Sequence, residues 1–194
     1  MDGQARVKMI FGQRGSGKSY LAQHLTKQHA RFIVFDTLNE YAEMGVVCDT
    51  MEAFEKFFLE NFEKPKFGIV YQPVNPQADF DLICEYVYRA GNMCFFVEEV
   101  DTFVSPLSVP EWMAHIIQRG RHKDITFIGV TQRPFGIPRI LTSQAREIYT
   151  FKQREPRDID YLCNFIGDEA QKAADLQQYY FLHYDDGKIN ISKL

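Results

Sequence analysis

Eight residues near the amino end of the chain, Gly12–Ser19, restrict its fold more than any other segment. They contain three glycines, follow an apolar run, Val7–Phe11, and lead into a helical pattern that begins at Lys18. Glycine allows backbone N–H groups to converge without Cβ clashes, and the start of a helix carries partial positive charge. A strand, a glycine-rich loop and a helix in this order therefore predict a loop that binds phosphate groups.

The spacing of this loop, a glycine, four residues and then Gly-Lys-Ser, matches the Walker A motif of proteins that bind nucleoside triphosphates. We expect Lys18 to contact the β- and γ-phosphates and the Ser19 hydroxyl to bind Mg²⁺. The loop does not specify the base, so ATP is the expected ligand; a chance glycine-rich turn is the alternative. The predicted nucleotide-binding residues are Gly12, Gln13, Arg14, Gly15, Ser16, Gly17, Lys18, Ser19 and Tyr20.

The rest of the chain alternates short apolar runs with helical periodicity, which predicts an α/β domain with a mostly parallel central sheet flanked by helices. The predicted strands are Val7–Phe11, Phe32–Phe35, Gly68–Tyr71, Met93–Val97, Ile125–Val130 and Glu147–Phe151. Two predicted helices begin at Lys18 and Pro110, two span Glu52–Phe62 and Phe80–Ala90, and one begins at Pro156 and is stopped by Gly167. The segments Tyr179–Tyr184 and Lys188–Ile191 flank a tight turn and predict a β-hairpin at the edge of the sheet.

A length of 194 residues predicts one domain, in which residues 156–194 form a helical and hairpin appendage. No apolar run approaches the ~18 residues of a membrane span, so we expect no integral membrane segment. The four cysteines are far apart in the sequence, which favours reduced thiols and an intracellular, cytoplasmic location.

The charge is unevenly distributed along the chain. The net charge of −4 argues against a nucleic-acid binder when the chain is taken as a whole. The segment from Arg119 to Arg157, however, has nine Lys or Arg against three Asp or Glu, a balance of +6, which leaves −10 for the remainder. One basic segment therefore lies within an acidic protein.

Two acidic residues follow the wholly apolar strand Met93–Val97 and give it the form of a Walker B motif. We expect Glu98 to hold Mg²⁺ and Glu99 to orient and deprotonate an attacking water. A surface acidic turn is the alternative interpretation. The metal position normally carries Asp rather than Glu, and Asp101 is a less favoured substitute.

The strand Ile125–Val130 continues into a polar residue, Gln132, close to its end. Placed between the first strand and the strand before Glu98, Gln132 would face the γ-phosphate and the attacking water as a sensor. An amide that caps a turn is the alternative.

The segments Gln118–Ile125 and Phe127–Pro134 together resemble the FtsK/HerA superfamily of DNA-pumping ATPases, in which an Arg-rich helix end leads into a strand ending in Thr-Gln-Arg-Pro. The segment Phe35–Tyr41 also resembles the turn after the second strand of HerA-like members. The small size is similar to that of the genome-packaging ATPases of membrane-containing viruses and, more distantly, of the Zot-like assembly ATPases of filamentous phages. The resemblance covers about residues 7–155.

This resemblance implies a RecA-like P-loop fold with an added strand between the Walker A and Walker B strands. It also implies a ring, a hexamer or pentamer, with ATP at the subunit interfaces. Arg119 and Arg121 then become candidate arginine fingers acting on a neighbour's nucleotide, although a solvated basic helix end explains them equally well.

The function that follows is an ATP-hydrolysing motor that translocates double-stranded DNA, in the setting of viral or phage genome packaging. Candidate contacts to DNA phosphates are Lys123, Arg139 and Arg146. Viral capsid or membrane-vertex proteins are further expected partners, in the host cytoplasm or the virion. The alternatives are a small P-loop nucleotide or metabolite kinase and a Zot-like ATPase of filamentous phage assembly or secretion.

Overall fold

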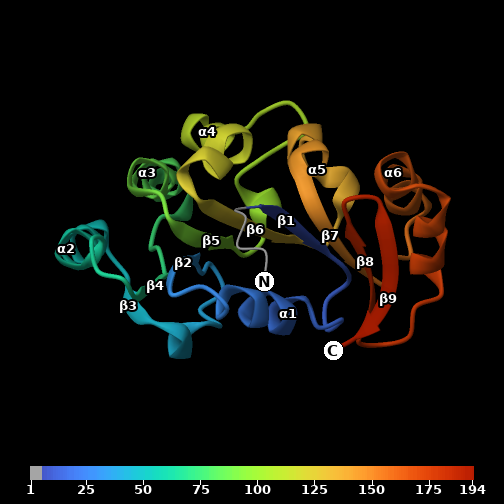
Figure 1. Ribbon diagram of the computed structural model, residues 1–194, viewed down its shortest axis with the longest axis horizontal. Helices are drawn as coiled ribbons and strands as arrows, with labels where there is room; N and C mark the ends of the chain where they lie inside the picture. The colour runs from blue at the N-terminus through green and yellow to red at the C-terminus, as the bar shows by residue number, and fades with distance from the viewer. Residues whose placement is uncertain (1–5) are drawn as a thin grey trace.

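The computed structural model describes residues 6–194, and nine strands within this range form one sheet. Their spatial order is β3-β4-β2-β5-β6-β1-β7-β8-β9 (Figure 1). The strands are β1 (Val7–Phe11), β2 (Arg31–Phe35), β3 (Val46–Cys48), β4 (Phe67–Tyr71), β5 (Met93–Val97), β6 (Ile125–Thr131), β7 (Ala145–Phe151), β8 (Tyr180–Asp185) and β9 (Lys188–Lys193).

The strands from β3 to β7 in this order run parallel, whereas β8 and β9 form an antiparallel hairpin that extends the sheet beyond β7. The turn between β8 and β9 contains Asp186 and Gly187, both with positive φ, of 48° and 90°. This geometry matches the twist of a two-residue hairpin. The predicted mostly parallel sheet with a C-terminal hairpin is therefore confirmed.

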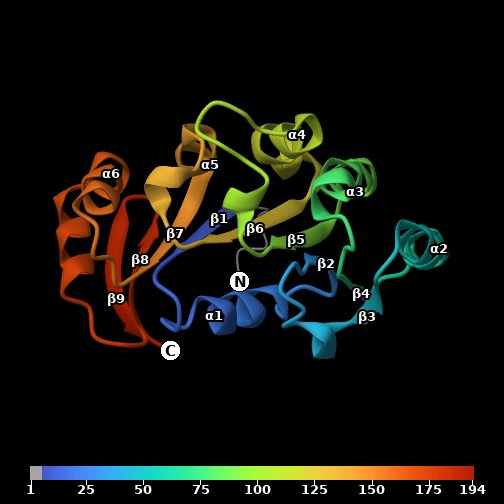
Figure 2. The same ribbon diagram turned by 180° about the vertical axis from the view of Figure 1, so that it is seen from behind.

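Helices cover both faces of the sheet. Helix α1 packs on one face, and the other five helices lie on the opposite face (Figures 1 and 2). The helices are α1 (Lys18–Thr26), α2 (Met51–Asn61), α3 (Pro76–Ala90), α4 (Glu111–Arg119), α5 (Arg139–Gln144) and α6 (Pro156–Ile166). Short 3₁₀ turns are η1 (Ala42–Met44), η2 (Val100–Thr102), η3 (Gly120–Lys123), η4 (Pro134–Gly136) and η5 (Asp168–Ala174). Within residues 6–194, none of these helices has the length and apolar character needed to cross a membrane.

Strand β5 shows why a continuous apolar run lies at the centre of the sheet. Phe95 and Val97 face the core beneath α2 to α6, while Cys94 and Phe96 face the core beneath α1. All of its residues are buried. Burying one such large apolar side chain contributes about 1.5–3 kcal/mol to folding. A polar residue in this run would therefore destabilise the protein, whichever face it pointed to.

The added strand implied by the resemblance is present, because β6 lies between β1 and β5. Two elements were not predicted. Strand β3 has three residues and two exposed valines at the sheet edge, and α5 has six residues, so neither gives a clear periodic pattern. Helix α3 begins at Pro76 rather than Phe80, because proline is favoured in a first helical turn.

The parallel strands all end on one side of the sheet and all begin on the opposite side. We call the side where β1, β5 and β6 end the carboxyl edge, and the side where they begin the amino edge. In open α/β sheets ligands bind outside the carboxyl ends of the strands, so the carboxyl edge is the first place to look for a site.

Candidate functional site

The glycine-rich loop joins the end of β1 to the start of α1 at the carboxyl edge. Gly17 has φ of 107° directly before the first residue of α1, and a Cβ at this position would meet the side chain of Leu194. The Nζ atom of Lys18 donates a hydrogen bond to the backbone oxygen of Gln13 at 3.0 Å. Helix α1 has nine residues, and its first turn follows the glycine-rich loop. Its free N–H groups and the positive end of its dipole are suited to bind phosphate oxygens.

A cavity of about 450 Å³ opens beside this loop, and we call it the nucleotide cavity. It combines the loop with the segment after β2 and with the ends of β5 and β6. All five residues with predicted catalytic or metal roles at this edge lie in its lining. The lining residues are Arg14, Gly15, Lys18, Ser19, Leu38, Glu40, Glu98, Glu99, Val130, Thr131 and Gln132.

Lys18 is nearly buried, at 8% exposure, and feels the charges of Glu98 and Glu99 on the acidic wall of the cavity. Burial lowers its pKa, and the charges of Glu98 and Glu99 oppose this shift. A desolvated ammonium group interacts more strongly with an anion than a hydrated one does. Lys18 is therefore suited to bind phosphates.

Glu98 extends from the end of β5 into a buried position, with 3% exposure. The Tyr41 hydroxyl donates a hydrogen bond to its carboxylate. Burial raises the pKa of Glu98 to about 7, although the Tyr41 hydrogen bond and the charge of Lys18 favour the ionised form. The carboxylate is therefore held at a cost that a cation supplied from outside the chain would reduce.

Glu99 takes a backbone conformation that is uncommon for a non-glycine residue, with φ of 48° and ψ of 53°. The chain turns here from β5 into η2, and consecutive carboxylates both line the nucleotide cavity. Such outliers occur preferentially at functional sites. Asp101, the less favoured substitute for a metal ligand, is exposed on η2 and lies outside the cavity lining.

Gln132 follows β6, between the ends of β1 and β5, and lines the nucleotide cavity. The next residue, Arg133, anchors this turn: its Nε atom lies 3.0 Å from the carboxylate of the buried Asp158 on α6. The same carboxylate accepts the backbone N–H of Phe135 at 3.2 Å. The turn that carries Gln132 is therefore attached to the helical layer on both sides of Pro134.

The oxygen atoms at this edge suit a magnesium ion. The Tyr41 hydroxyl donates a hydrogen bond to the Glu98 carboxylate and lies close to the Ser19 hydroxyl, and Ser19 and Glu98 both line the nucleotide cavity. Among residues 6–194, no group of three or more His, Cys, Asp or Glu residues has a metal-binding arrangement. In nucleotide sites Mg²⁺ is usually held by one or two protein oxygens together with phosphates and water, and Ser19 and Glu98 fit that pattern.

A second cavity, of about 330 Å³, lies on the other side of the glycine-rich loop. Gln13, Arg14, Gly15 and Ser16 form one wall, so the loop separates two cavities. The opposite wall comes from the end of β7, the start of β8 and residues between them, namely Phe151, Lys152, Arg154, Leu176, Gln177, Gln178, Tyr179 and Tyr180. Tyr20 is 65% exposed nearby, in an apolar hollow that it shares with Gly17 and Tyr179.

The candidate arginine fingers lie at the amino edge, opposite the nucleotide cavity. Arg119 ends α4 and Arg121 lies in η3, and both are exposed. Because α4 and η3 lead into the beginning of β6, the structure does not bring these arginines to the glycine-rich loop of the same chain.

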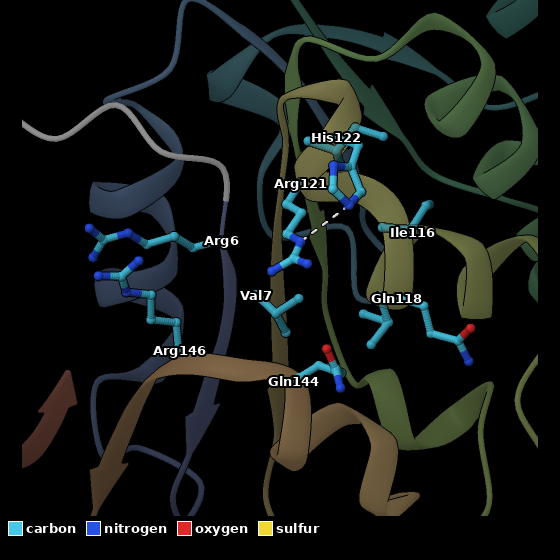
Figure 3. A pocket seen from close by; sticks show the side chains of 10 residues that line it. Arg6, Val7, Ile116, Gln118, Arg121, His122, Gln144 and Arg146 are labelled. Atoms are coloured by element: carbon cyan, nitrogen blue, oxygen red, sulfur yellow. Dashed lines mark hydrogen bonds between the residues drawn. The ribbon is translucent and has the colours of Figure 1, made fainter. Parts of the chain in front are cut away.

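A cavity of about 380 Å³ lies at this edge and includes Arg121 but not Arg119 in its lining. We call it the amino-edge cavity. Its apolar part comes from β1, α4 and β6, and Arg121, Gln118 and Gln144 extend from different elements around it (Figure 3). The lining residues are Arg6, Val7, Ile116, Ile117, Gln118, Arg121, His122, Ile125, Gln144 and Arg146.

The three candidate DNA contacts do not lie together. Arg146 lines the amino-edge cavity and forms an ion pair with Asp186 at 3.3 Å. The Lys123 ammonium lies 5.1 Å from the ring centre of Tyr88. The Arg139 guanidinium lies 5.1 Å from the ring centre of Phe165, on the helical layer. The basic segment therefore contributes to several surfaces rather than to a single one.

Two residues of the site, Glu40 and Tyr41, had no predicted role. Both belong to the segment Phe35–Tyr41, whose resemblance to HerA-like members was the available signal. The sequence could not show that Tyr41 reaches Glu98, because these residues lie 57 positions apart on different elements.

Comparisons with known proteins show which proteins this chain is similar to. The sequence model of a family described as an AAA domain matches residues 1–141. The DNA packaging ATPase P9 of Enterobacteria phage PRD1 is 24% identical over 195 residues, which cover 94% of this chain and 83% of that protein. The genome packaging NTPase B204 from Sulfolobus turreted icosahedral virus 2, solved in complex with AMP, has a TM-score of 0.81 at 25% identity and covers 100% of this chain and 98% of its own.

The fold also extends to a more distant protein. The N-terminal domain of zonular occludens toxin from Neisseria meningitidis has a TM-score of 0.57 at 11% identity, over 98% of this chain and 94% of that one. At this identity the likeness concerns the fold alone. The predicted similarity to viral packaging ATPases, with Zot-like proteins at a greater distance, is confirmed.

Proposed function

Because this chain belongs to the AAA domain family, we propose that it is the motor that moves double-stranded DNA into a virus particle at the expense of ATP. The chain is an ATP-hydrolysing enzyme, and its homologues include packaging ATPases of viruses. The observation that carries the proposal is the nucleotide cavity, in which Lys18, Ser19, Glu98, Glu99 and Gln132 converge at the carboxyl edge.

In the proposed mechanism, Lys18 and the backbone N–H groups of the glycine-rich loop hold the β- and γ-phosphates of ATP. Ser19 and Glu98 hold Mg²⁺, which neutralises charge on the phosphates when it is bound. Glu99 accepts a proton from the attacking water, and Gln132 orients that water and responds to the γ-phosphate. The water oxygen forms a bond to the γ-phosphorus, while the bond between the γ-phosphorus and the bridging oxygen breaks. That oxygen leaves with ADP.

The proposal includes a ring in which a neighbouring subunit supplies an arginine finger. Arg121 is the better candidate, because it lines the amino-edge cavity, whereas Arg119 does not. We place the amino edge of one subunit against the carboxyl edge of the next in this head-to-tail ring. Arg121→Ala should lower the turnover number by ~10³-fold or more, and Arg119→Ala should lower it much less.

Mixing tests this assignment directly. Arg121→Ala subunits, added to Glu99→Gln subunits that retain Arg121, should recover activity at mixed interfaces. Equal loss from both arginine variants, or no recovery on mixing, would contradict the assignment. Mass photometry of the wild-type protein with ATP measures whether the ring forms and whether it is a hexamer or a pentamer.

Contacts to DNA in this proposal go to phosphates, because a packaging motor must move over any sequence. Arg146, Lys123 and Arg139 are the proposed contacts, and each should contribute about one unit to the slope of log affinity against log salt. The proposal treats residues 1–194 as one ATPase domain acting in the host cytoplasm or the virion. Capsid or membrane-vertex proteins are its further proposed partners.

The decisive experiment measures ATP hydrolysis with and without double-stranded DNA. We expect DNA to stimulate hydrolysis, and Glu99→Gln to lower the DNA-stimulated rate ~10²–10⁴-fold by removing the general base. Asp101→Asn is the matched control, since Asp101 lies two positions away but outside the cavity, and it should keep most of the activity. Hydrolysis that is indifferent to DNA would refute the motor, and transfer of phosphate to a nucleoside monophosphate would indicate the kinase instead.

A further inference from the structure

The segment that follows β2 is fixed by one buried acid. Asp36 is fully buried, and its carboxylate accepts the backbone N–H groups of Glu40 at 3.1 Å and Tyr41 at 3.0 Å. It also accepts the side-chain amide of Gln72 at 2.9 Å. Because three donors converge on it, this carboxylate determines the path of the chain from the end of β2 to Tyr41.

Tyr41 occupies the position that this path gives it. Its side chain is fully buried and packs edge-on against Phe96 of β5, with ring centres 5.0 Å apart. Its hydroxyl donates to the Glu98 carboxylate and lies close to the Ser19 hydroxyl. One phenol therefore lies beside both residues proposed to hold Mg²⁺, and its hydrogen bond fixes the carboxylate of Glu98.

The chemistry of a phenol matters at this point. A lysine or arginine in direct contact with the Glu98 carboxylate would neutralise its charge and compete with a bound cation. A tyrosine hydroxyl fixes the orientation of the carboxylate and leaves its negative charge in place. Partners of this kind, behind the groups that touch a metal, usually change metal affinity by about 10–100-fold when removed.

We propose that Tyr41 is a positioning residue that holds Ser19 and Glu98 in the arrangement required for binding Mg²⁺ with ATP, and that Asp36 fixes Tyr41 for this role. The inference rests on the proposed roles of Ser19 and Glu98 in metal binding. It assigns a function to the segment Phe35–Tyr41, which the proposed mechanism otherwise leaves without one.

The test measures the Mg²⁺ dependence of nucleotide binding rather than hydrolysis. A fluorescent N-methylanthraniloyl ATP is titrated onto the full chain over a series of MgCl₂ concentrations and in EDTA. In Tyr41→Phe the half-saturating MgCl₂ concentration should rise ~10-fold, and the affinity in EDTA should change less than about twofold. Circular dichroism establishes that the variant is folded.

The matched control is Tyr71→Phe. Tyr71 is also a fully buried tyrosine, on β4, and its hydroxyl donates a hydrogen bond of 2.8 Å to Asp79, outside the nucleotide cavity. The variant lacks this hydrogen bond. Its Mg²⁺ dependence should equal that of the wild type even if its melting temperature falls. An equal shift in both variants would mean that Tyr41 acts only through general stability, and would overturn the inference.

Glu98→Gln separates this inference from the proposed function. If Tyr41 acts through Glu98, the added change Tyr41→Phe in a Glu98→Gln chain should have no further effect on the half-saturating MgCl₂ concentration. A shift caused by Glu98→Gln but not by Tyr41→Phe would overturn the positioning role alone. An unchanged Mg²⁺ dependence in Glu98→Gln would overturn the proposed metal role of Glu98 itself.

Discussion

Two buried glutamates occupy opposite edges of the same sheet, and their surroundings differ in kind. Glu98, at the carboxyl edge, is 3% exposed, and Glu147, at the amino edge, is 5% exposed. Burial raises the pKa of Glu98 to about 7. Burial acts in the same direction on Glu147, but nearby His183, Lys8, Tyr149 and Arg6 hold the pKa of that carboxyl well below its usual range.

The partners explain the contrast. The carboxylate of Glu147 lies 3.0 Å from the Arg6 guanidinium, 3.2 Å from the Lys8 ammonium and 3.4 Å from the His183 ring. Glu98 receives a hydrogen bond from neutral Tyr41 and only longer-range attraction from Lys18. The chain itself neutralises Glu147, whereas within residues 6–194 no cation forms an ion pair with Glu98, which is the expected state of a residue that binds an external cation.

The largest effect that separates the two glutamates should appear in hydrolysis. Glu98→Gln removes the charged metal ligand, so the rate of ATP hydrolysis should fall more than ~100-fold. Glu147→Gln, the same chemical change at the other edge, should leave the rate per folded molecule within about threefold of the wild type. Steady-state hydrolysis at saturating ATP and MgCl₂ measures both. Equal losses would break the distinction between a site residue and a structural one.

The second largest effect should be the loss of stability in Glu147→Gln. Glu147→Gln leaves Arg6 and Lys8, whose side chains are each 13% exposed, without their shared carboxylate. Breaking a buried ion pair by removing one partner costs about 3–5 kcal/mol, so the free energy of unfolding should fall by up to this amount. Urea unfolding at pH 8 without nucleotide measures it. A loss below about 1 kcal/mol would mean that solvent already screens this cluster.

The sequence predicted the glycine-rich loop, the acidic strand end and Gln132, because each is a local pattern on a recognisable element. The contrast between the two glutamates could not be predicted in this way. The partners of Glu147 come from β7, from β8 and from β1 with the residue before it, and the partner of Glu98 comes from the loop after β2. Whether a buried carboxylate meets a guanidinium or a phenol depends on which strands are neighbours, and apolar patterning does not encode that order.

The same limit explains other features that the sequence left out. The second cavity forms only because the residues before β8 return to the glycine-rich loop. The basic segment, a single block in the sequence, is distributed over the amino edge, the carboxyl edge and the helical layer, since β6 and β7 carry its residues from one edge to the other. Charge counted along a chain therefore predicts composition better than it predicts a surface.

Glu98→Gln should change stability in the opposite direction to Glu147→Gln. The pKa of Glu98 is raised in the folded protein, so burying this side chain is unfavourable at pH 8 whether it stays ionised or takes up a proton. This lowers the free energy of unfolding by up to about 3 kcal/mol. Glutamine can still accept the Tyr41 hydroxyl and removes this cost, so the nucleotide-free protein should gain about 1–3 kcal/mol. Urea unfolding at pH 8 measures the gain. A loss of stability would show that Lys18 already compensates Glu98.

The smallest effects should be those of pH, and they should have opposite signs. The folded pKa of Glu147 lies below its unfolded value of about 4.3, so its contribution is present above pH 4.3 and is lost as the pH falls further. The folded pKa of Glu98 is raised, so its contribution is present below about pH 4.3 and is lost as the pH rises through 7.

Urea unfolding of the wild type and both Gln variants, at pH 3.5, 5.5 and 8, separates the two contributions. The difference between the wild type and Glu147→Gln should stay constant from pH 8 to 5.5 and shrink at pH 3.5. The difference for Glu98→Gln should grow from pH 5.5 to 8, and it should disappear when Mg²⁺ and ATP are added, because the bound cation then compensates the carboxylate. Parallel pH profiles for the two variants would mean that both glutamates are structural.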